Sequence, residues 1–180
     1  MKQGADFMRQ GKVIAYPTEA VYGLGCDPAN ETAVRHLLAL KNRSPQAGLI
    51  LLADSIECLA PFVQPVAEEL LEAALKTWPG PVTWLFPRAD GVPDWLAGKH
   101  PTVAVRVTAH AVCRALCSAF GGAIVSTSAN PGGAVPAVTP GEVEHYFGDG
   151  IAGVVQGSLG GFSKPSEIRD LVTGAVVRAA

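Results

Sequence analysis

Small polar side chains are densest between residues 126 and 130. Four of the five side chains from Ser126 to Asn130 carry a hydroxyl or an amide group, and a proline and two glycines follow them. Such a cluster supplies hydrogen-bond donors and acceptors that could hold an anion or an amino acid. An Asn-Pro-Gly turn is the alternative, because these residues favour tight turns for backbone reasons alone. The apolar run 122–125 just before the cluster favours a site at a strand end.

Basic side chains occur at two places that suit an anionic ligand. Lys41 and Arg43 follow a predicted helix, where the helix dipole alone stabilises a cation by about 0.3–1 kcal/mol. Alternatively, both side chains bind a polyphosphate, lysine through a compact charge and arginine through the several N–H donors of a planar guanidinium. Arg106 lies in the apolar run 102–107, where an unpaired buried charge would be very costly. It therefore needs an anionic partner, either a protein carboxylate or a ligand.

Residues 16–25 follow the first apolar run and carry a hydroxyl, a carboxylate and two glycines. Thr18 and Glu19 supply the polar groups, and the glycines permit close approach of the backbone. A dinucleotide-binding glycine motif is rejected, because Pro28 stands where the third glycine belongs. An ordinary strand-to-helix turn remains the alternative. The sequence leaves open whether Glu19 is a base, a metal contact or a structural acceptor.

Several common catalytic arrangements are absent from the sequence. It contains no P-loop motif, no evident Ser/His/Asp or Cys/His triad, and no cysteine spacing typical of zinc. Cys113 and Cys117 are expected to be small core residues on a helix. The four histidines are expected to be solvated or structural: His36, His100, His110 and His145. A bound nucleotide would then depend on side chains for contacts that a P-loop backbone usually makes.

Apolar runs of strand length alternate with helical patterns along the chain. Strands are expected over 13–16, 49–52, 82–86, 102–107, 123–126, 151–155 and 175–177. Helices are expected over 31–41, 66–78 and 109–120, and from 140 to about 147 behind a Thr139–Glu142 capping box. The alternation predicts one α/β domain over residues 1–180, with helices packed on a mixed, partly parallel sheet. Within 102–107 it places Thr102, Ala104 and Arg106 on one face.

Composition excludes several classes of protein. Hydrophobic residues make up 48% and charged residues 17%, which is typical of a compact globular protein rather than a disordered one. The apolar runs are too short to span a membrane, and the N-terminus lacks the apolar segment of a signal peptide. Reduced cysteines and a cytoplasmic location without membrane contact are expected. The net charge of −2 gives no general attraction to nucleic acid, so any RNA contact needs a local basic patch.

Six blocks of residues, in order, resemble the YrdC/TsaC family of threonylcarbamoyl-AMP synthases. The blocks are 16–25, 41–43, 78–83, 103–107, 126–130 and 165–170. They span nearly the whole chain, which is similar to the short bacterial form of the family. Many relatives have threonine, proline and lysine or histidine where this chain has Ala20, Ser44 and Ala47. These departures concern the substrate pocket and leave the reaction class unaffected.

The resemblance implies a fold and a reaction. The expected fold is α/β, a twisted mixed parallel and antiparallel sheet with flanking helices around a concave, positively lined cavity, similar to dihydroxybutanone-phosphate synthase. The expected reaction converts L-threonine, bicarbonate and ATP to threonylcarbamoyl-adenylate and pyrophosphate, with Mg²⁺ entering on the ATP. A tRNA-modifying transferase complex would then use the product on the adenosine beside the anticodon.

The resemblance also implies the residues of the site. Lys41 and Arg43 are the expected catalytic residues. The expected ATP contacts are Lys41, Arg43, Thr102, Ser128, Asn130, Pro136 and Arg178, with shaping of the loop as the alternative role for Asn130. The expected contacts to threonine or its carbamate are Thr18, Arg106, Ser126 and Ser166. No metal ligand from the protein is expected, and positioning with charge neutralisation would suffice for catalysis.

Two alternatives stay open at this stage. One is a related carbamoyltransferase that makes carbamoyl-adenylate, but such relatives carry this domain in a longer chain with acylphosphatase and zinc-finger segments that this sequence lacks. The other is a double-stranded-RNA-binding module, with a local patch that includes Lys164 and Arg169, and a weak contact with tRNA would use the same patch. Salt-dependent RNA affinity without ATP turnover would favour the second alternative.

Overall fold

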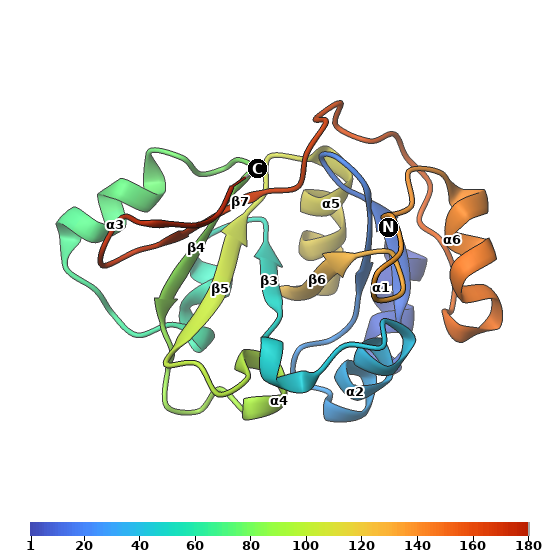
Figure 1. The fold of residues 1–180 in the computed structure, drawn as a ribbon, viewed down its shortest axis with the longest axis horizontal. Coiled ribbons are helices and arrows are strands. Elements are labelled where there is room, and N and C mark those ends of the chain that lie inside the picture. The colour runs from blue at the N-terminus through green and yellow to red at the C-terminus, as the bar shows by residue number, and fades with distance from the viewer. Residues whose placement is uncertain (180) are drawn as a thin grey trace.

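The computed structural model describes residues 1–179, which fold around one eight-stranded sheet (Figure 1). The strands are β1 (Ile14–Pro17), β2 (Tyr22–Gly25), β3 (Ile50–Ala53), β4 (Val82–Pro87), β5 (Thr102–Val107), β6 (Ile124–Ser128), β7 (Glu167–Asp170) and β8 (Val176–Arg178). Their order across the sheet is β1-β2-β6-β3-β5-β4-β7-β8. β3 pairs parallel with β5 and β4 pairs parallel with β7, whereas the other neighbours are antiparallel. The predicted mixed sheet is confirmed.

Six α-helices flank this sheet in the described residues. They are α1 (Lys2–Arg9), α2 (Glu31–Leu40), α3 (Glu68–Leu75), α4 (Asp94–Ala97), α5 (Ala111–Phe120) and α6 (Pro140–Phe147). The α2 helix begins at Asn30, whose side chain accepts a hydrogen bond from the Ala33 N–H at 3.0 Å. The predicted capping box opens α6, where Thr139 and Glu142 bond each other's backbone N–H groups. Among the described residues, every helix is too short or too polar to cross a bilayer.

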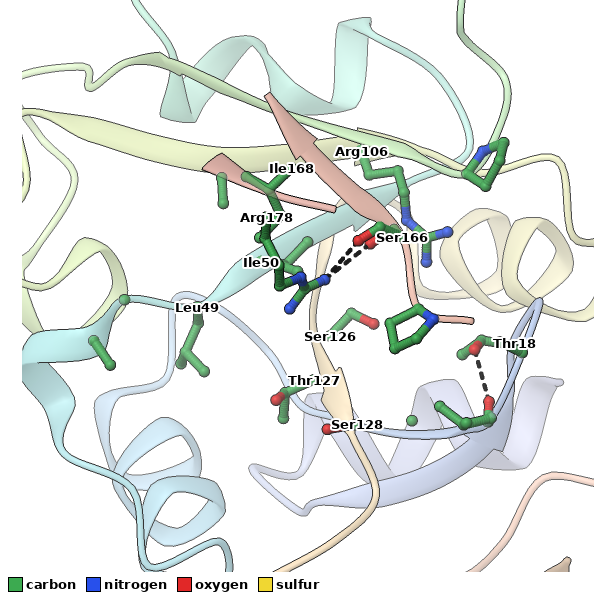
Figure 2. Close-up of a pocket in the computed structure, with 18 of the residues that line it drawn as sticks. Thr18, Leu49, Ile50, Arg106, Ser126, Thr127, Ser128, Ser166, Ile168 and Arg178 are labelled. Atoms are coloured by element: carbon green, nitrogen blue, oxygen red, sulfur yellow. Dashed lines mark hydrogen bonds between the residues drawn. The ribbon is translucent and has the colours of Figure 1, made fainter. Parts of the chain in front are cut away.

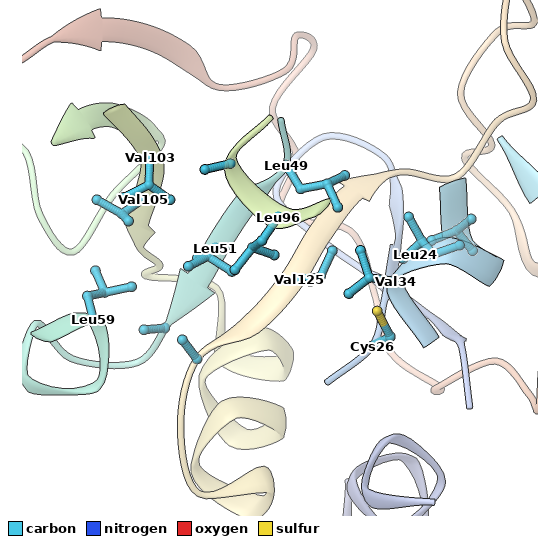
Figure 3. Packing of buried hydrophobic residues seen from close by; sticks show 14 of the residues in the cluster. Leu24, Cys26, Val34, Leu49, Leu51, Leu59, Leu96, Val103, Val105 and Val125 are labelled. Atoms are coloured by element: carbon cyan, nitrogen blue, oxygen red, sulfur yellow. The ribbon is translucent and has the colours of Figure 1, made fainter. Parts of the chain in front are cut away.

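Alternation along the central strands buries apolar side chains on both faces of the sheet. Leu51 of β3 packs in the larger core with Leu96 of α4 and residues of α2 (Figure 3). Its neighbour Leu52 points to the opposite face and packs in a smaller core with Met8 of α1 and Leu116 of α5. Each fully buried leucine contributes about 1.5–3 kcal/mol relative to an exposed one. These two cores fix the sheet that positions the site.

The β5 strand divides its side chains between the core and a cavity. Val103 and Val105 are buried in the larger core. Thr102, Ala104 and Arg106 face the other way and line a hollow on the face of the sheet that carries α5. The predicted alternation of β5 is therefore confirmed, and it places Arg106 in the cavity wall.

Some predicted elements differ from the structure. The strand expected over 151–155 is wrong, because this segment pairs with β1 at a single bridge, Ala15 to Val154. The helix expected over 66–78 is shorter, because Ala67 is extended and α3 ends at Leu75. Residues 16–25 form the hairpin of β1 and β2, which the sequence did not predict. Glycine is required in this hairpin, since a Cβ atom at Gly25 would lie 2.7 Å from the Tyr16 ring.

Candidate functional site

A cavity of about 340 Å³ opens on the sheet face that β3, β4, β5, β6 and β7 share (Figure 2). Its wall follows β5 from Thr102 to Arg106, which are four residues apart and so about 13 Å apart along a strand. We call these two parts the Thr102 end and the Arg106 end. Leu49 and Ile50 line the cavity toward the Thr102 end, since Ile50 pairs with Ala104. The cavity is therefore long enough to take two ligands in contact.

Arg106 is held by a buried ion pair with Glu19. The Arg106 Nη1 atom lies 2.8 Å from Glu19 Oε2, and both side chains are less than a tenth exposed. The Thr108 hydroxyl donates to the other carboxylate oxygen of Glu19 at 2.7 Å. Burial alone would raise the pKa of Glu19, but the charge of Arg106 and the Thr108 hydrogen bond outweigh it and hold that pKa below its ordinary value. Glu19 is thus the anionic partner that the sequence required for Arg106.

The hydroxyl groups at the Arg106 end are fixed by contacts within the protein. Thr18 donates to the Val21 carbonyl at 2.7 Å (Figure 2). The Ser166 hydroxyl lies 3.0 Å from the hydroxyl of Thr83, which is fully buried on β4. Ser126 of β6, at 6% exposure, lines the cavity nearer its middle, since it pairs with Ile50, which is level with Ala104. These side chains converge from separate elements into a pre-formed polar wall.

Basic side chains outnumber acidic ones in the cavity. The arginines that line it are Arg43, Arg106 and Arg178, and Lys164 adds a fourth cation. Burial, with further contributions from Arg43 and Arg106, lowers the pKa of Arg178 below its ordinary value. Glu19 is the one carboxylate among the described residues of the wall. Clustered positive charge in a concave site attracts a ligand with several negative charges.

Arg178 and Arg43 are also oriented by main-chain oxygens. Arg178 donates from Nη2 to the Ser166 carbonyl at 2.7 Å (Figure 2). Arg43 donates to the Gly48 carbonyl at 2.9 Å. Each guanidinium has five N–H donors, so these contacts leave others for a ligand.

Lys41 and Asn130 lie outside the cavity wall, whereas ATP contact was expected for Lys41, and either phosphate contact or shaping of the loop for Asn130. Lys41 is buried, with 4% of the residue exposed. Its ammonium group donates hydrogen bonds to the Ser128 carbonyl at 2.5 Å and to the Asn130 carbonyl at 2.9 Å. The Asn130 side chain accepts from the Ser128 hydroxyl at 2.6 Å and donates to two loop carbonyls. Burial and then Arg43 lower the pKa of Lys41 to about 8. In this structure the two residues hold the 126–134 loop from behind.

The other expected ATP contacts lie on the wall. They are Arg43, Thr102, Ser128, Pro136 and Arg178. Of the three departures from the family pattern, Ala20 and Ala47 line the cavity, whereas Ser44 caps the short turn Pro45–Ala47. His100 is exposed, in agreement with the solvated role that the sequence indicated, and it also lines the cavity. No local signal could have found it, because its place depends on how the chain returns after α4.

The described residues offer no protein cage for a metal ion. Within residues 1–179, no group of three histidine, cysteine, aspartate or glutamate side chains is placed to bind one. Both oxygens of Glu19 are already engaged by Arg106 and Thr108. A divalent cation in this cavity would have to be held mainly by its ligand's own oxygens.

Comparison with known proteins agrees with this geometry. The family model Sua5_yciO_yrdC, described as "Telomere recombination", matches residues 6–180. The threonylcarbamoyl-AMP synthase of Halorhodospira halophila is 52% identical over 178 residues, which cover 99% of this chain and 93% of that one.

Solved structures show the same fold. The P. abyssi Sua5 protein in complex with L-threonine has a TM-score of 0.90 and 32% identity, over 97% of this chain and 52% of that chain. This chain therefore spans about half the length of that protein. The YciO protein of E. coli has a TM-score of 0.83 and 27% identity, over 98% of this chain and 87% of that one. Together with the family match, these similarities establish that the chain belongs to the Sua5/YciO/YrdC family.

Proposed function

We propose that this chain is a threonylcarbamoyl-AMP synthase, which converts L-threonine, bicarbonate and ATP to threonylcarbamoyl-adenylate and pyrophosphate. Relatives that carry this name are about half identical to it over nearly their whole length. The observation that carries the proposal is Arg106, a guanidinium that Glu19 holds at one end of an electropositive cavity lined by hydroxyl side chains. That end suits an amino acid, and the rest of the cavity suits a polyphosphate.

Threonine binds at the Arg106 end in this proposal. Arg106 accommodates the carboxylate through parallel N–H···O bonds, which a planar guanidinium can form and an ammonium group cannot. The ion pair with Glu19 involves only the Nη1 atom of Arg106, so other N–H donors of the guanidinium remain for a ligand. Ser126, Ser166 and Thr18 bind the amine, the carbamate or the hydroxyl of the substrate.

ATP occupies the remainder of the cavity. Arg43, Arg178 and Ser128 contact the phosphates, and Thr102 and Pro136 line the site for the nucleoside. Lys41 and Asn130 act by holding the Ser128 loop in place. Mg²⁺ bound to the phosphates of ATP would supply charge neutralisation there.

The chemistry then needs no protein nucleophile. The neutral amine of threonine attacks the carbon of bicarbonate; a carbon–nitrogen bond forms, a carbon–oxygen bond breaks and water leaves, which gives a carbamate. A carbamate oxygen then attacks the α-phosphorus of ATP. An oxygen–phosphorus bond forms, the bond from the α-phosphorus to the oxygen that bridges to the β-phosphate breaks, and pyrophosphate leaves. The arginines stabilise the charge that develops on the phosphates, and the cavity holds the two reactants in line. A tRNA-modifying transferase complex is the proposed consumer of the adenylate.

An omission experiment tests this function. Pyrophosphate release should require ATP, threonine and bicarbonate together, and it should stop when any one of them is left out. Release of inorganic phosphate without threonine, and without pyrophosphate, would contradict the proposal. Salt-dependent RNA affinity without ATP turnover would instead indicate a binding module.

A further inference from the structure

A carboxylate in this cavity needs an explanation, because the proposed ligands are anions. Glu19 is the one acidic side chain among the described residues of the wall. Left alone, its charge would oppose the carboxylate of threonine and the phosphates of ATP. Two roles remain for it on the proposed function. It could accept a proton during formation of the carbamate, or it could position a group that binds the substrate.

Both oxygens of Glu19 lie against protein groups. Oε2 is buried and forms the ion pair with Arg106 Nη1 at 2.8 Å, although it makes no hydrogen bond of good geometry. Oε1 accepts the Thr108 hydroxyl at 2.7 Å. A general base must come within hydrogen-bond reach of the proton that it removes, with an oxygen open toward the substrate. The geometry of Glu19 fits a holder of Arg106 better than a base.

The backbone at Glu19 is clamped as well. The Glu19 carbonyl accepts from the Phe162 N–H, and the Thr18 carbonyl accepts from the Gly160 N–H, each at 3.0 Å. The segment packs so closely here that a Cβ atom on Gly160 would lie 2.9 Å from the Glu19 Cα. On the other side, the Thr108 hydroxyl that binds Glu19 also accepts from the His110 N–H at 3.0 Å. The carboxylate is therefore fixed from two directions and can fix Arg106 in turn.

We infer that Glu19 is a positioning residue, which orients the Arg106 guanidinium toward the carboxylate of threonine and does not act as the base of the reaction. The inference rests on the proposed function. It explains why an acidic side chain is tolerated in an anion-binding site, since the positive charge of Arg106 neutralises the Glu19 carboxylate. In such a site, the side chains that contact the ligand must be held in place by further hydrogen bonds to the protein.

Steady-state kinetics of Glu19→Gln tests the inference. Glutamine keeps the size of the side chain and can still accept from Thr108, but it loses the charge that orients Arg106. We expect the KM for threonine to rise about tenfold, the loss of roughly one charged hydrogen bond. The KM for ATP should change less than about twofold, and the pH profile of kcat should keep its shape. The matched variant Thr108→Val removes only the second hydrogen bond and should raise the KM for threonine by a smaller factor.

Other outcomes separate the alternatives. A fall in kcat of about 10²–10⁴-fold with loss of the acid limb of the pH profile, at unchanged KM for threonine, would make Glu19 the base and overturn the inference. If Glu19→Gln does not fold, Thr108→Val carries the test, and an unchanged KM for threonine in that variant would also overturn the inference. Absence of threonine-dependent turnover in the unaltered protein would instead refute the proposed function.

Discussion

Replacement of Arg106 by alanine is the most demanding test of the site's energetics. The change removes the guanidinium and leaves the Glu19 carboxylate buried, with only Thr108 as a partner. Exposed ion pairs contribute about 0–1 kcal/mol, but this pair is less than a tenth exposed. Stranding one partner of a buried pair costs about 3–5 kcal/mol. For a chain of this length, that corresponds to a fall in Tm of about 6–20 °C.

The loss of stability should depend on pH. In the unaltered protein the pKa of Glu19 lies below its ordinary value, so its contribution to stability is present above the unfolded-state pKa and disappears as pH falls through the folded-state pKa. Without Arg106, burial dominates and raises the pKa of Glu19 above its ordinary value. The variant is then most destabilised near neutral pH. It recovers stability as the pH falls through the raised pKa, where Glu19 takes up a proton.

Urea unfolding at neutral and mildly acidic pH measures both effects, with threonine and ATP titrated separately by calorimetry. The double variant Arg106→Ala/Glu19→Gln no longer strands a charge and should recover part of the stability, but not the affinity for threonine. An Arg106→Ala protein with unchanged stability would contradict the buried ion pair. A folded Arg106→Ala protein with normal threonine affinity would contradict the carboxylate contact.

Three further predictions concern the loop and the hydroxyl wall. Lys41→Met should lower the Tm and also weaken ATP binding, because it removes the hydrogen bonds that hold the 126–134 loop. Melting curves with and without ATP measure both effects. A variant with normal stability that no longer binds ATP would make Lys41 a direct ATP contact. Lys41 is charged below a pKa of about 8, so ATP affinity should fall as pH rises through that value. Arg43→Gln removes a neighbouring positive charge and should move this fall in ATP affinity to higher pH. Calorimetric ATP titrations from neutral to alkaline pH give the midpoint of the fall, and an unchanged midpoint would refute its assignment to Lys41. Thr83→Val removes the partner of the Ser166 hydroxyl and should cost about 0.5–1.5 kcal/mol of stability and raise the KM for threonine, whereas Thr83→Ser should restore both; equal kinetics in the two variants would exclude this role.

The parts of the fold that sequence predicts well are those set by local patterns. The Thr139–Glu142 capping box and the alternation of Thr102, Ala104 and Arg106 depend on neighbouring residues, and both are confirmed. The need of Arg106 for an anionic partner also follows from its apolar strand. The identity of that partner does not, because Glu19 is far away in the chain and reaches Arg106 only through the hairpin of β1 and β2.

The parts that sequence could not predict depend on how distant segments pack. Lys41 has the same neighbours in sequence whether it points into the cavity or behind the loop, and only the position of the Ser128 and Asn130 carbonyls decides between them. His100 reaches the cavity through the return of the chain after α4. The segment 151–155 has a strand-like composition, but it forms only one β-bridge and three backbone hydrogen bonds with the start of the chain and adds no strand to the sheet, because such pairing is a tertiary property.

In the proposed function, one cavity joins threonine, the carbon of bicarbonate and the adenylyl group in a single product. Mass spectrometry of the nucleotide product, made with carbon-13 bicarbonate and nitrogen-15 threonine, identifies that product. We expect an adenylate that carries both labels, formed together with pyrophosphate and lost in the Arg106→Ala variant. An adenylate that carries the threonine nitrogen without the bicarbonate carbon would be a threonyl-adenylate, and it would refute the proposed function.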